Sequence, residues 1–113
     1  MTPQEKQLIK QLLEVSQRVL QLTENIDTYE DFVNNRYIFD DILSNVTVIY
    51  EINHKLPKSL KKGELRSIDW QKIDQYEHLI RSDFHQLDLQ TLWTAIKNDL
   101  PVLVRKLKEL EIS

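Results

Sequence analysis

Apolar side chains recur every three or four residues along most of the chain, which is the spacing of one face of an α-helix. In the first segment this pattern predicts a helix over about residues 3–24, whose apolar face includes Ile9, Leu12, Leu13, Val19 and Leu20. Thr2 and Pro3 suit the start of this helix, because a hydroxyl caps free amides and proline fits the first helical turn.

A second helix is predicted from Asp27 or Thr28 to about His54. Its apolar residues form two rows with a spacing of seven, namely Phe32, Phe39 and Val46, and Ile42, Ile49 and Leu56. Both rows lie on one face, which suits packing against neighbouring helices. The helix has to end before Pro57, because the residue that precedes a proline avoids the helical conformation.

The longest predicted loop covers residues 57–67, which contain the lone Gly63. It holds most of a cluster of cations, Lys55, Lys58, Lys61, Lys62 and Arg66. A third helix is expected to begin at Ser67 or Asp69 and to end between residues 82 and 86. Its apolar positions are Trp70, Ile73, Tyr76, Leu79 and Ile80.

A fourth helix is expected after Asp88, with one apolar stripe that we assign to the core, formed by Leu89, Leu92, Trp93, Ile96 and Leu100. Pro101 predicts a kink or a restart. No alternating strand pattern is apparent. The expected fold is therefore all-α, an up-and-down bundle of four to five helices in one domain over residues 1–113. The long apolar rows, with Tyr37, Ile38 and Val48 off the main face, also lead us to expect a homodimer.

The composition narrows the class of protein. The length of 113 residues suits one domain, and 41% hydrophobic with 29% charged residues is typical of a globular protein. The absence of cysteine excludes disulfides and thiolate metal sites. Neither a signal peptide nor an apolar run long enough to span a bilayer is apparent, so we expect a cytoplasmic protein. Because the net charge is −3, an RNA contact would require a local basic patch or a dimer groove.

Residue types with metal or phosphate chemistry give weak signals. The histidines, His54, His78 and His85, lack the one-turn spacing of a helical zinc motif. Asp74 and His78 are four apart, and we interpret them as a solvated pair. The cations of residues 55–66 suit phosphate contacts. Without an interleaved aromatic residue for base stacking, we interpret them as a solvated loop. We expect no metal and no cofactor.

Several short motifs follow one another in an order that is typical of one helical family. They are Tyr29-Glu30-Asp31-Phe32, Asn45 to Glu51, Leu56-Pro57, Ile68 to Ile73, Asp88 to Trp93, and Asp99 to Leu103. Together they resemble the HepT-like branch of the HEPN helical-bundle proteins over roughly residues 3–110. The stretch from Trp70 to Leu103 is the most specific part of the resemblance.

The resemblance implies a helical bundle that forms a homodimer within a toxin–antitoxin system. Family members are typically ribonuclease toxins, and their partner is a small nucleotidyltransferase antitoxin that can adenylylate a tyrosine. In the family, an Arg near the end of the third helix, a His a few residues on and a Tyr just after it face their copies across the dimer. They cleave RNA without metal, since RNA supplies its own nucleophile in the 2′-hydroxyl.

In this chain other residues occupy those positions. Counted from Trp70 without gaps, the family Arg falls on Glu77 and its Asn neighbour on His78. The family His falls on Ser82, and the family Tyr falls on Phe84. Glu reverses the charge at the phosphate position, Ser cannot carry a proton near neutral pH as imidazole can, and Phe has no hydroxyl to modify.

A displaced pair keeps a second hypothesis open. Arg81 and His85 are four residues apart, so on a helix they share a face. The family also tends to have Gly in the second helix where this chain has the bulky Tyr50. The first hypothesis is a non-catalytic HEPN-type dimer that serves as an interaction or regulatory module. The second is a metal-independent ribonuclease toxin that uses Arg81 and His85, and the third is a helical adaptor with incidental resemblance.

Overall fold

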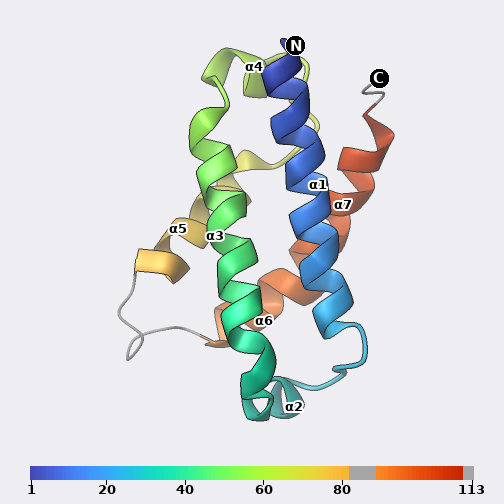
Figure 1. The fold of residues 1–113 in the computed structure, drawn as a ribbon, viewed down its shortest axis with the longest axis vertical. Coiled ribbons are helices and arrows are strands. Elements are labelled where there is room, and N and C mark those ends of the chain that lie inside the picture. The colour runs from blue at the N-terminus through green and yellow to red at the C-terminus, as the bar shows by residue number, and fades with distance from the viewer. Residues whose placement is uncertain (82–88, 111–113) are drawn as a thin grey trace.

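The computed structural model describes residues 1–81 and 89–110, with side chains for residues 1–75 and 89–110. Over these residues the chain forms helices and no strand (Figure 1), so the all-α prediction is confirmed. The helices are α1 (Pro3–Thr23), α2 (Tyr29–Asn34), α3 (Phe39–Lys55), α4 (Lys58–Lys62), α5 (Trp70–Arg81), α6 (Leu89–Thr94) and α7 (Leu100–Glu109). None of the helices in the described part has the length and apolarity that a membrane crossing needs.

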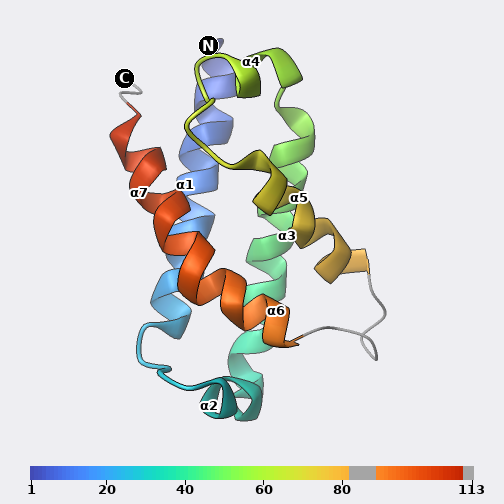
Figure 2. The same cartoon turned by 180° about the vertical axis from the view of Figure 1, so that it is seen from behind.

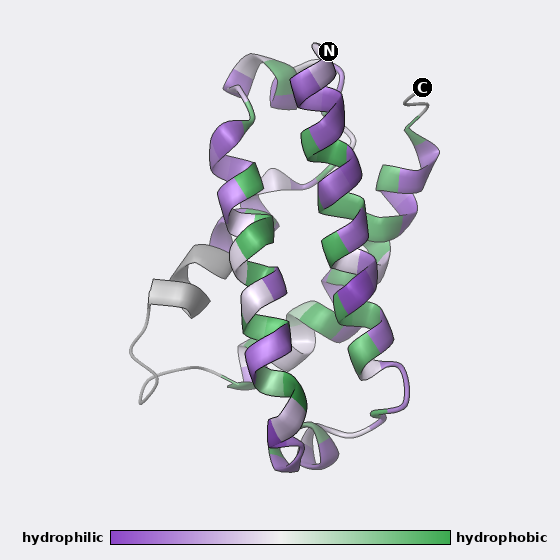
Figure 3. Cartoon of the chain, in the orientation of Figure 1, coloured by the Kyte–Doolittle hydropathy of each residue, from purple (hydrophilic) through white to green (hydrophobic). Residues whose placement is uncertain are grey.

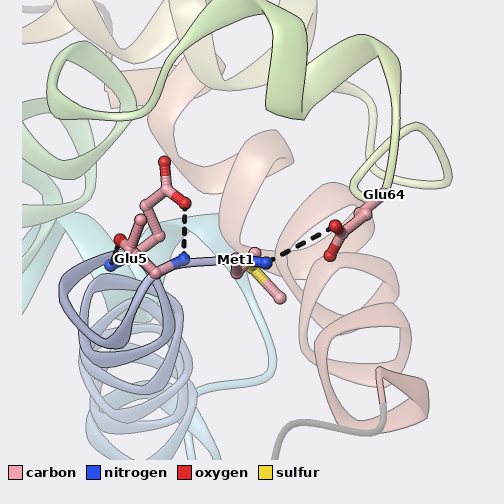
Figure 4. Close-up of polar contacts among 4 residues, drawn as sticks. Met1, Glu5 and Glu64 are labelled. Carbon is pink, nitrogen blue, oxygen red and sulfur yellow. Dashed lines mark hydrogen bonds and ion pairs between the residues drawn. The ribbon is translucent and has the colours of Figure 1, made fainter.

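Helix α1 begins as the sequence predicts. The hydroxyl of Thr2 accepts a hydrogen bond from the amide of Glu5 at 3.1 Å, and the Glu5 carboxylate accepts one from the amide of Thr2 at 2.8 Å (Figure 4). This reciprocal pair satisfies two amides that have no partner within the helix. The N-terminal amine of Met1 lies 3.5 Å from the Glu64 carboxylate, which joins the start of α1 to the segment after α4.

The core lies between α1 and α3, which run side by side in opposite directions (Figures 1 and 2). Helix α7 packs against α1, and α5 packs against α3. Apolar and polar residues alternate along α1 and α3 (Figure 3), as the periodicity of the sequence predicts. The side chains with no exposed surface at all include Leu12, Val19, Phe32, Ile42, Ile49, Leu65 and Leu92.

The second predicted helix is divided, which the sequence pattern did not predict. Asn35 leaves the helical conformation with φ −99° and ψ 78°, and a single 3-10 turn, η1 (Arg36–Ile38), separates α2 from α3. Asn tolerates such a break because its short amide competes with the backbone for hydrogen bonds. The break leaves Phe32 fully buried, with its ring 5.1 Å from Phe39 and 4.9 Å from Trp93 between centroids.

The prediction of a loop over residues 57–67 is wrong in its first half, which forms α4. Pro57 caps this helix with ψ 146°, and its fixed φ is already suited to a helix start. The helix ends where the amide of Gly63 donates to the carbonyls of Ser59 at 3.0 Å and Leu60 at 3.2 Å. Leu60 packs its half-buried side chain against the core and so holds the short helix in place.

The kink predicted at Pro101 takes the form of a π-helical turn, η3 (Ala95–Asp99), between α6 and α7. The amide of Leu100 donates to the carbonyl of Ala95, five residues before it. Pro101 has no N–H for the carbonyl of Lys97, and its ring would clash there in an α-helix. The wider turn relieves that clash, so the chain passes from α6 to α7 with a bend (Figure 2).

Trp93 lies at the edge of the core and is not fully enclosed by it. One face packs against Phe32, and the Lys97 ammonium lies 4.8 Å from the centroid of the ring. The same ammonium donates to the carbonyl of Thr23 at 3.0 Å, where it caps the end of α1. The core assignment from the sequence therefore holds for only part of this side chain, which is half-buried.

Candidate functional site

Helix α5 carries the positions at which the resemblance implies catalytic residues, and its first turn is firmly anchored. The carboxylate of Asp69 accepts a hydrogen bond from the amide of Lys72 at 3.3 Å. The indole Nε1 of Trp70 donates to the carbonyl of Leu65 at 2.9 Å. Ile73 is buried, with 3% of its surface exposed. The start of α5 is therefore fixed to the segment that follows α4.

A buried asparagine joins α3, α4 and α5. Asn53 is 2% exposed, and its Nδ2 donates to Oδ1 of Asp74 at 2.6 Å. The backbone carbonyl of Asn53 lacks the usual helical partner, because Pro57 has no N–H to donate four residues later. Lys61 replaces it, since its Nζ donates to this carbonyl at 2.6 Å. Within the described residues Oδ1 of Asn53 has no hydrogen-bond partner.

Lys61 points into the structure, unlike the other cations around it. Its Nζ lies 5.3 Å from the centroid of the Trp70 ring, which favours a cation on its face. Burial lowers the pKa of Lys61 below its ordinary value of 10.5, the carboxylate of Asp74 opposes this shift, and the nearby Lys58 adds to it. Lys61 is therefore part of the scaffold that orients α5, which the sequence reasoning missed.

Pro57 is the feature of the sequence from which this network could have been predicted. A proline four residues after Asn53 leaves a helix carbonyl without a donor, and a lysine in the next helix is a natural replacement. Asp74, interpreted from the sequence as half of a solvated pair with His78, accepts the hydrogen bond from Asn53. The side chain of His78 lies outside the described residues.

The structure describes the backbone, but not the side chains, of three of the predicted catalytic positions. Glu77, His78 and Arg81 belong to the uninterrupted helix α5, although their side chains lie outside the described residues. Ser82, Phe84 and His85 fall entirely outside the described residues. Within residues 1–75 and 89–110, no group of His, Asp and Glu side chains gathers as metal ligands.

Two rings on the last turns of α3 lie close to the basic segment. The rings of Tyr50 and His54 meet edge to face, with 4.5 Å between their centroids. His54 is exposed and directly precedes Lys55. The sequence reasoning found no aromatic residue inside the cation cluster, and the helical spacing of α3 brings this pair to its border. The Tyr50 side chain is half-buried at the position where the family tends to have Gly.

A shallow groove of about 110 Å³ lies between the start of α5 and the end of η3 with α7. Its apolar lining comes from Ile68, Ile73, Val102 and Leu103. At its rim the Lys72 ammonium pairs with the Asp99 carboxylate at 3.1 Å. The groove has room for about one side chain, and this rim pair is already satisfied, so we assign no chemistry to it.

Comparison with known proteins identifies the class. The model of the family described as "Ribonuclease HepT-like" matches residues 12–110. Because this match covers most of the chain, the protein belongs to the HepT-like family of HEPN-type helical proteins. A protein of Methanocaldococcus jannaschii named "Putative RNase MJ1216" is 22% identical over 105 residues, which cover 93% of this chain and 85% of that protein. No solved structure matches the chain.

Proposed function

We propose that this protein is a HepT-like helical homodimer that does not cleave RNA. In this proposal it serves as an interaction or regulatory module of a toxin–antitoxin-type system in the cytoplasm, with a small nucleotidyltransferase as its partner. The family membership supports the dimer and the partner as expectations. The identities of the residues at the end of α5 support the loss of cleavage.

The observation that carries the proposal is the continuity of α5. The helix runs from Trp70 to Arg81 without a break, which supports a count without gaps from Trp70 through residue 81. That count places Glu77 at the position of the family Arg and His78 at the position of its Asn neighbour. Continued without a gap, it places Ser82 at the position of the family His.

The chemistry of these substitutions opposes RNA cleavage. A carboxylate at position 77 repels the phosphate that the family Arg stabilises. A serine at position 82 cannot serve as a proton carrier near neutral pH, and the phenyl ring of Phe84 offers no hydroxyl for adenylylation. Because the members of a catalytic unit act together, the loss of several of them leaves little activity.

The test is a cleavage assay on purified protein with single-stranded RNA, in the presence and absence of a chelator. We expect no cleavage by the wild type or by Glu77→Arg, because restoring one role leaves the others missing. Glu77→Gln is the matched control, since it removes the carboxylate without adding a cation. Cleavage by the wild type would overturn the proposal, as would growth arrest when the protein is expressed in cells.

A second candidate function is a metal-independent ribonuclease toxin that uses Arg81 and His85. One observation favours it: Arg81 is the last residue of α5 and lies one helical turn beyond Glu77, on the same side of the helix. In this case wild-type cleavage disappears in Arg81→Ala and in His85→Ala, while circular dichroism and dimer mass stay unchanged. Arg18→Ala, which removes an exposed cation of α1, is the control variant.

The homodimer and the partner are tested separately. Light scattering at micromolar concentration should give about twice the chain mass of 13.5 kDa, and a clean monomer at that concentration contradicts the dimer. Co-expression and co-purification with a small nucleotidyltransferase tests the partner. Adenylylation of the protein by that enzyme at any site near residue 84 would contradict the role assigned to Phe84.

A further inference from the structure

We propose that the exposed cations around α4, Lys55, Lys58, Lys62 and Arg66, form a docking surface for the phosphate backbone of single-stranded RNA. We call these four residues the α4 surface. The inference goes beyond the proposed function, which assigns no RNA contact, and a protein that holds RNA without cutting it needs phosphate contacts away from positions 77–85. The structure contributes three observations that the sequence did not contain.

The first observation is that the structure separates one scaffold cation from four exposed ones. Lys61 donates to the Asn53 carbonyl and faces Trp70, so it is committed to the scaffold. The four side chains of the α4 surface are exposed, and Lys58 and Lys62 lie four apart on one face of α4. The Arg66 guanidinium donates to the carbonyl of Gly63 at 3.0 Å. The ammonium groups of Lys55, Lys58 and Lys62 make no ion pair or hydrogen bond within the described residues.

The second observation concerns the carboxylates at this end of the molecule. Glu64 pairs with the N-terminal amine of Met1, and Glu5 accepts the hydrogen bond from the amide of Thr2 (Figure 4). The Met1 ammonium therefore offsets the negative charge of Glu64, which reduces the opposition of that carboxylate to an incoming phosphate. Residues 55–66 carry five Lys and Arg side chains and one acidic side chain, although the net charge of the chain is −3.

The third observation is that charge is separated along the molecule. The opposite end, around α2 and the start of α3, carries six exposed carboxylates and the single base Arg36 within residues 24–41. Figure 1 places α2 and α4 at opposite ends, and the principal dimensions are 41 × 27 × 19 Å. A polyanion is therefore attracted to the α4 end and repelled from the α2 end, which gives its binding a direction.

Two features favour RNA over an acidic protein as the occupant. The Tyr50–His54 ring pair borders the α4 surface, and aromatic rings beside cations are the usual platform for unpaired bases. Along α5 a rise of about 1.5 Å per residue places position 77 about 10 Å from Trp70, a length that a strand of a few nucleotides spans. An acidic peptide gains nothing from the ring pair.

The experiment measures fluorescence anisotropy of a short labelled single-stranded RNA against the intact protein at several salt concentrations. Each phosphate contact contributes about −0.7 to the slope of log K against log salt. Lys58→Gln/Lys62→Gln should therefore lower the slope by about 1.4 and weaken binding about 25-fold near 0.1 M salt. Arg18→Gln/Arg36→Gln is the matched control, because it removes two exposed cations outside the α4 surface and should change binding less than about twofold.

Three outcomes decide the proposal. Loss of RNA binding in the α4 variant alone, with dimer mass and circular dichroism unchanged, supports it. Equal losses in both variants mean that only net charge matters, which overturns it. If RNA fails to bind the wild type at low salt while a polyglutamate peptide binds through Lys58 and Lys62, the surface belongs to an acidic protein. The same samples are run on gels to detect RNA cleavage. Cleavage would contradict the proposed non-catalytic function, and this result is obtained independently of whether RNA binds to the α4 surface.

Discussion

Replacing Lys61 by methionine tests whether the network at the end of α3 orients α5. The substitution keeps an unbranched apolar stem of similar length and removes the ammonium group. It leaves the carbonyl of Asn53 without a donor, because Pro57 cannot supply an N–H. It also removes the cation above the Trp70 ring. The free energy of unfolding is therefore expected to fall.

Three contributions set the size of the change in unfolding free energy. Two of them destabilise the protein and the third offsets part of that loss. A buried carbonyl without a partner costs about 1–3 kcal/mol. Loss of the cation on the Trp70 ring costs about 0.5–1 kcal/mol at a partly exposed site. Removal of the ammonium relieves the burial penalty that lowers the pKa of Lys61, which offsets part of both losses. We expect a net loss of about 1–3 kcal/mol, dominated by the Asn53 carbonyl.

Urea titration followed by circular dichroism measures this loss. Lys62→Met is the matched control, because Lys62 is the next residue of α4 and is exposed, so its replacement should change stability by less than about 0.5 kcal/mol. Equal effects of the two substitutions would refute the argument. They would mean that the Asn53 carbonyl finds water or another donor and that Lys61 does not orient α5.

The pH dependence of stability gives an independent test of the same network. Burial lowers the pKa of Lys61 below 10.5, so the unfolded chain binds this proton more tightly than the folded protein. The stability of the wild type relative to Lys61→Met should therefore rise as pH increases through the folded pKa toward 10.5. Urea titrations of both proteins across that alkaline range measure the difference. A difference that falls with rising pH would contradict the assigned burial.

Two further predictions concern aromatic residues. Trp93→Ala should lose about 2–3 kcal/mol in urea titration, less than a fully buried ring would, because only one face packs against Phe32; a loss below about 1 kcal/mol would mean that this contact carries little of the stability. Tyr37→Ser should change the stability of the single chain by less than about 0.5 kcal/mol, because Tyr37 is 97% exposed. If Tyr37→Ser instead halves the mass seen by light scattering, Tyr37 belongs to the dimer interface.

Periodicity predicted the long elements well because their burial depends on a repeated local pattern. The start of α1 at Pro3 followed from Thr2 and Pro3 alone. The break at Asn35 did not, because the apolar rows of Phe32, Phe39 and Val46 keep their spacing of seven across it. Periodicity records which residues are apolar, and it does not record where the backbone turns between them. The same limit concealed α4, a helix of one turn.

The network around Asn53 shows what a sequence pattern omits. Its hydrogen bonds join residues eight and 21 positions apart, so no helical spacing connects them. The sequence grouped Lys61 with four other cations by composition, whereas burial separates it from them. Polar networks of this kind follow from the path of the chain in three dimensions. In contrast, the family resemblance could be found from the sequence because its motifs are local and ordered.

The choice between the two candidate functions reduces to where a phosphate can sit along α5. At an effective dielectric constant of about 20, a unit charge 4 Å from a phosphate contributes about 4 kcal/mol, so exchanging Arg for Glu changes the interaction by about 8 kcal/mol. One helical turn advances about 5.4 Å, so a cation at position 81 lies about 6.7 Å from a phosphate beside position 77 and contributes about 2.5 kcal/mol, less than the roughly 4 kcal/mol of repulsion from Glu77. Arg81 therefore cannot compensate for Glu77 at the family position. A catalytic Arg81 requires the phosphate to move one full turn toward His85, which makes the site new in geometry as well as in residues.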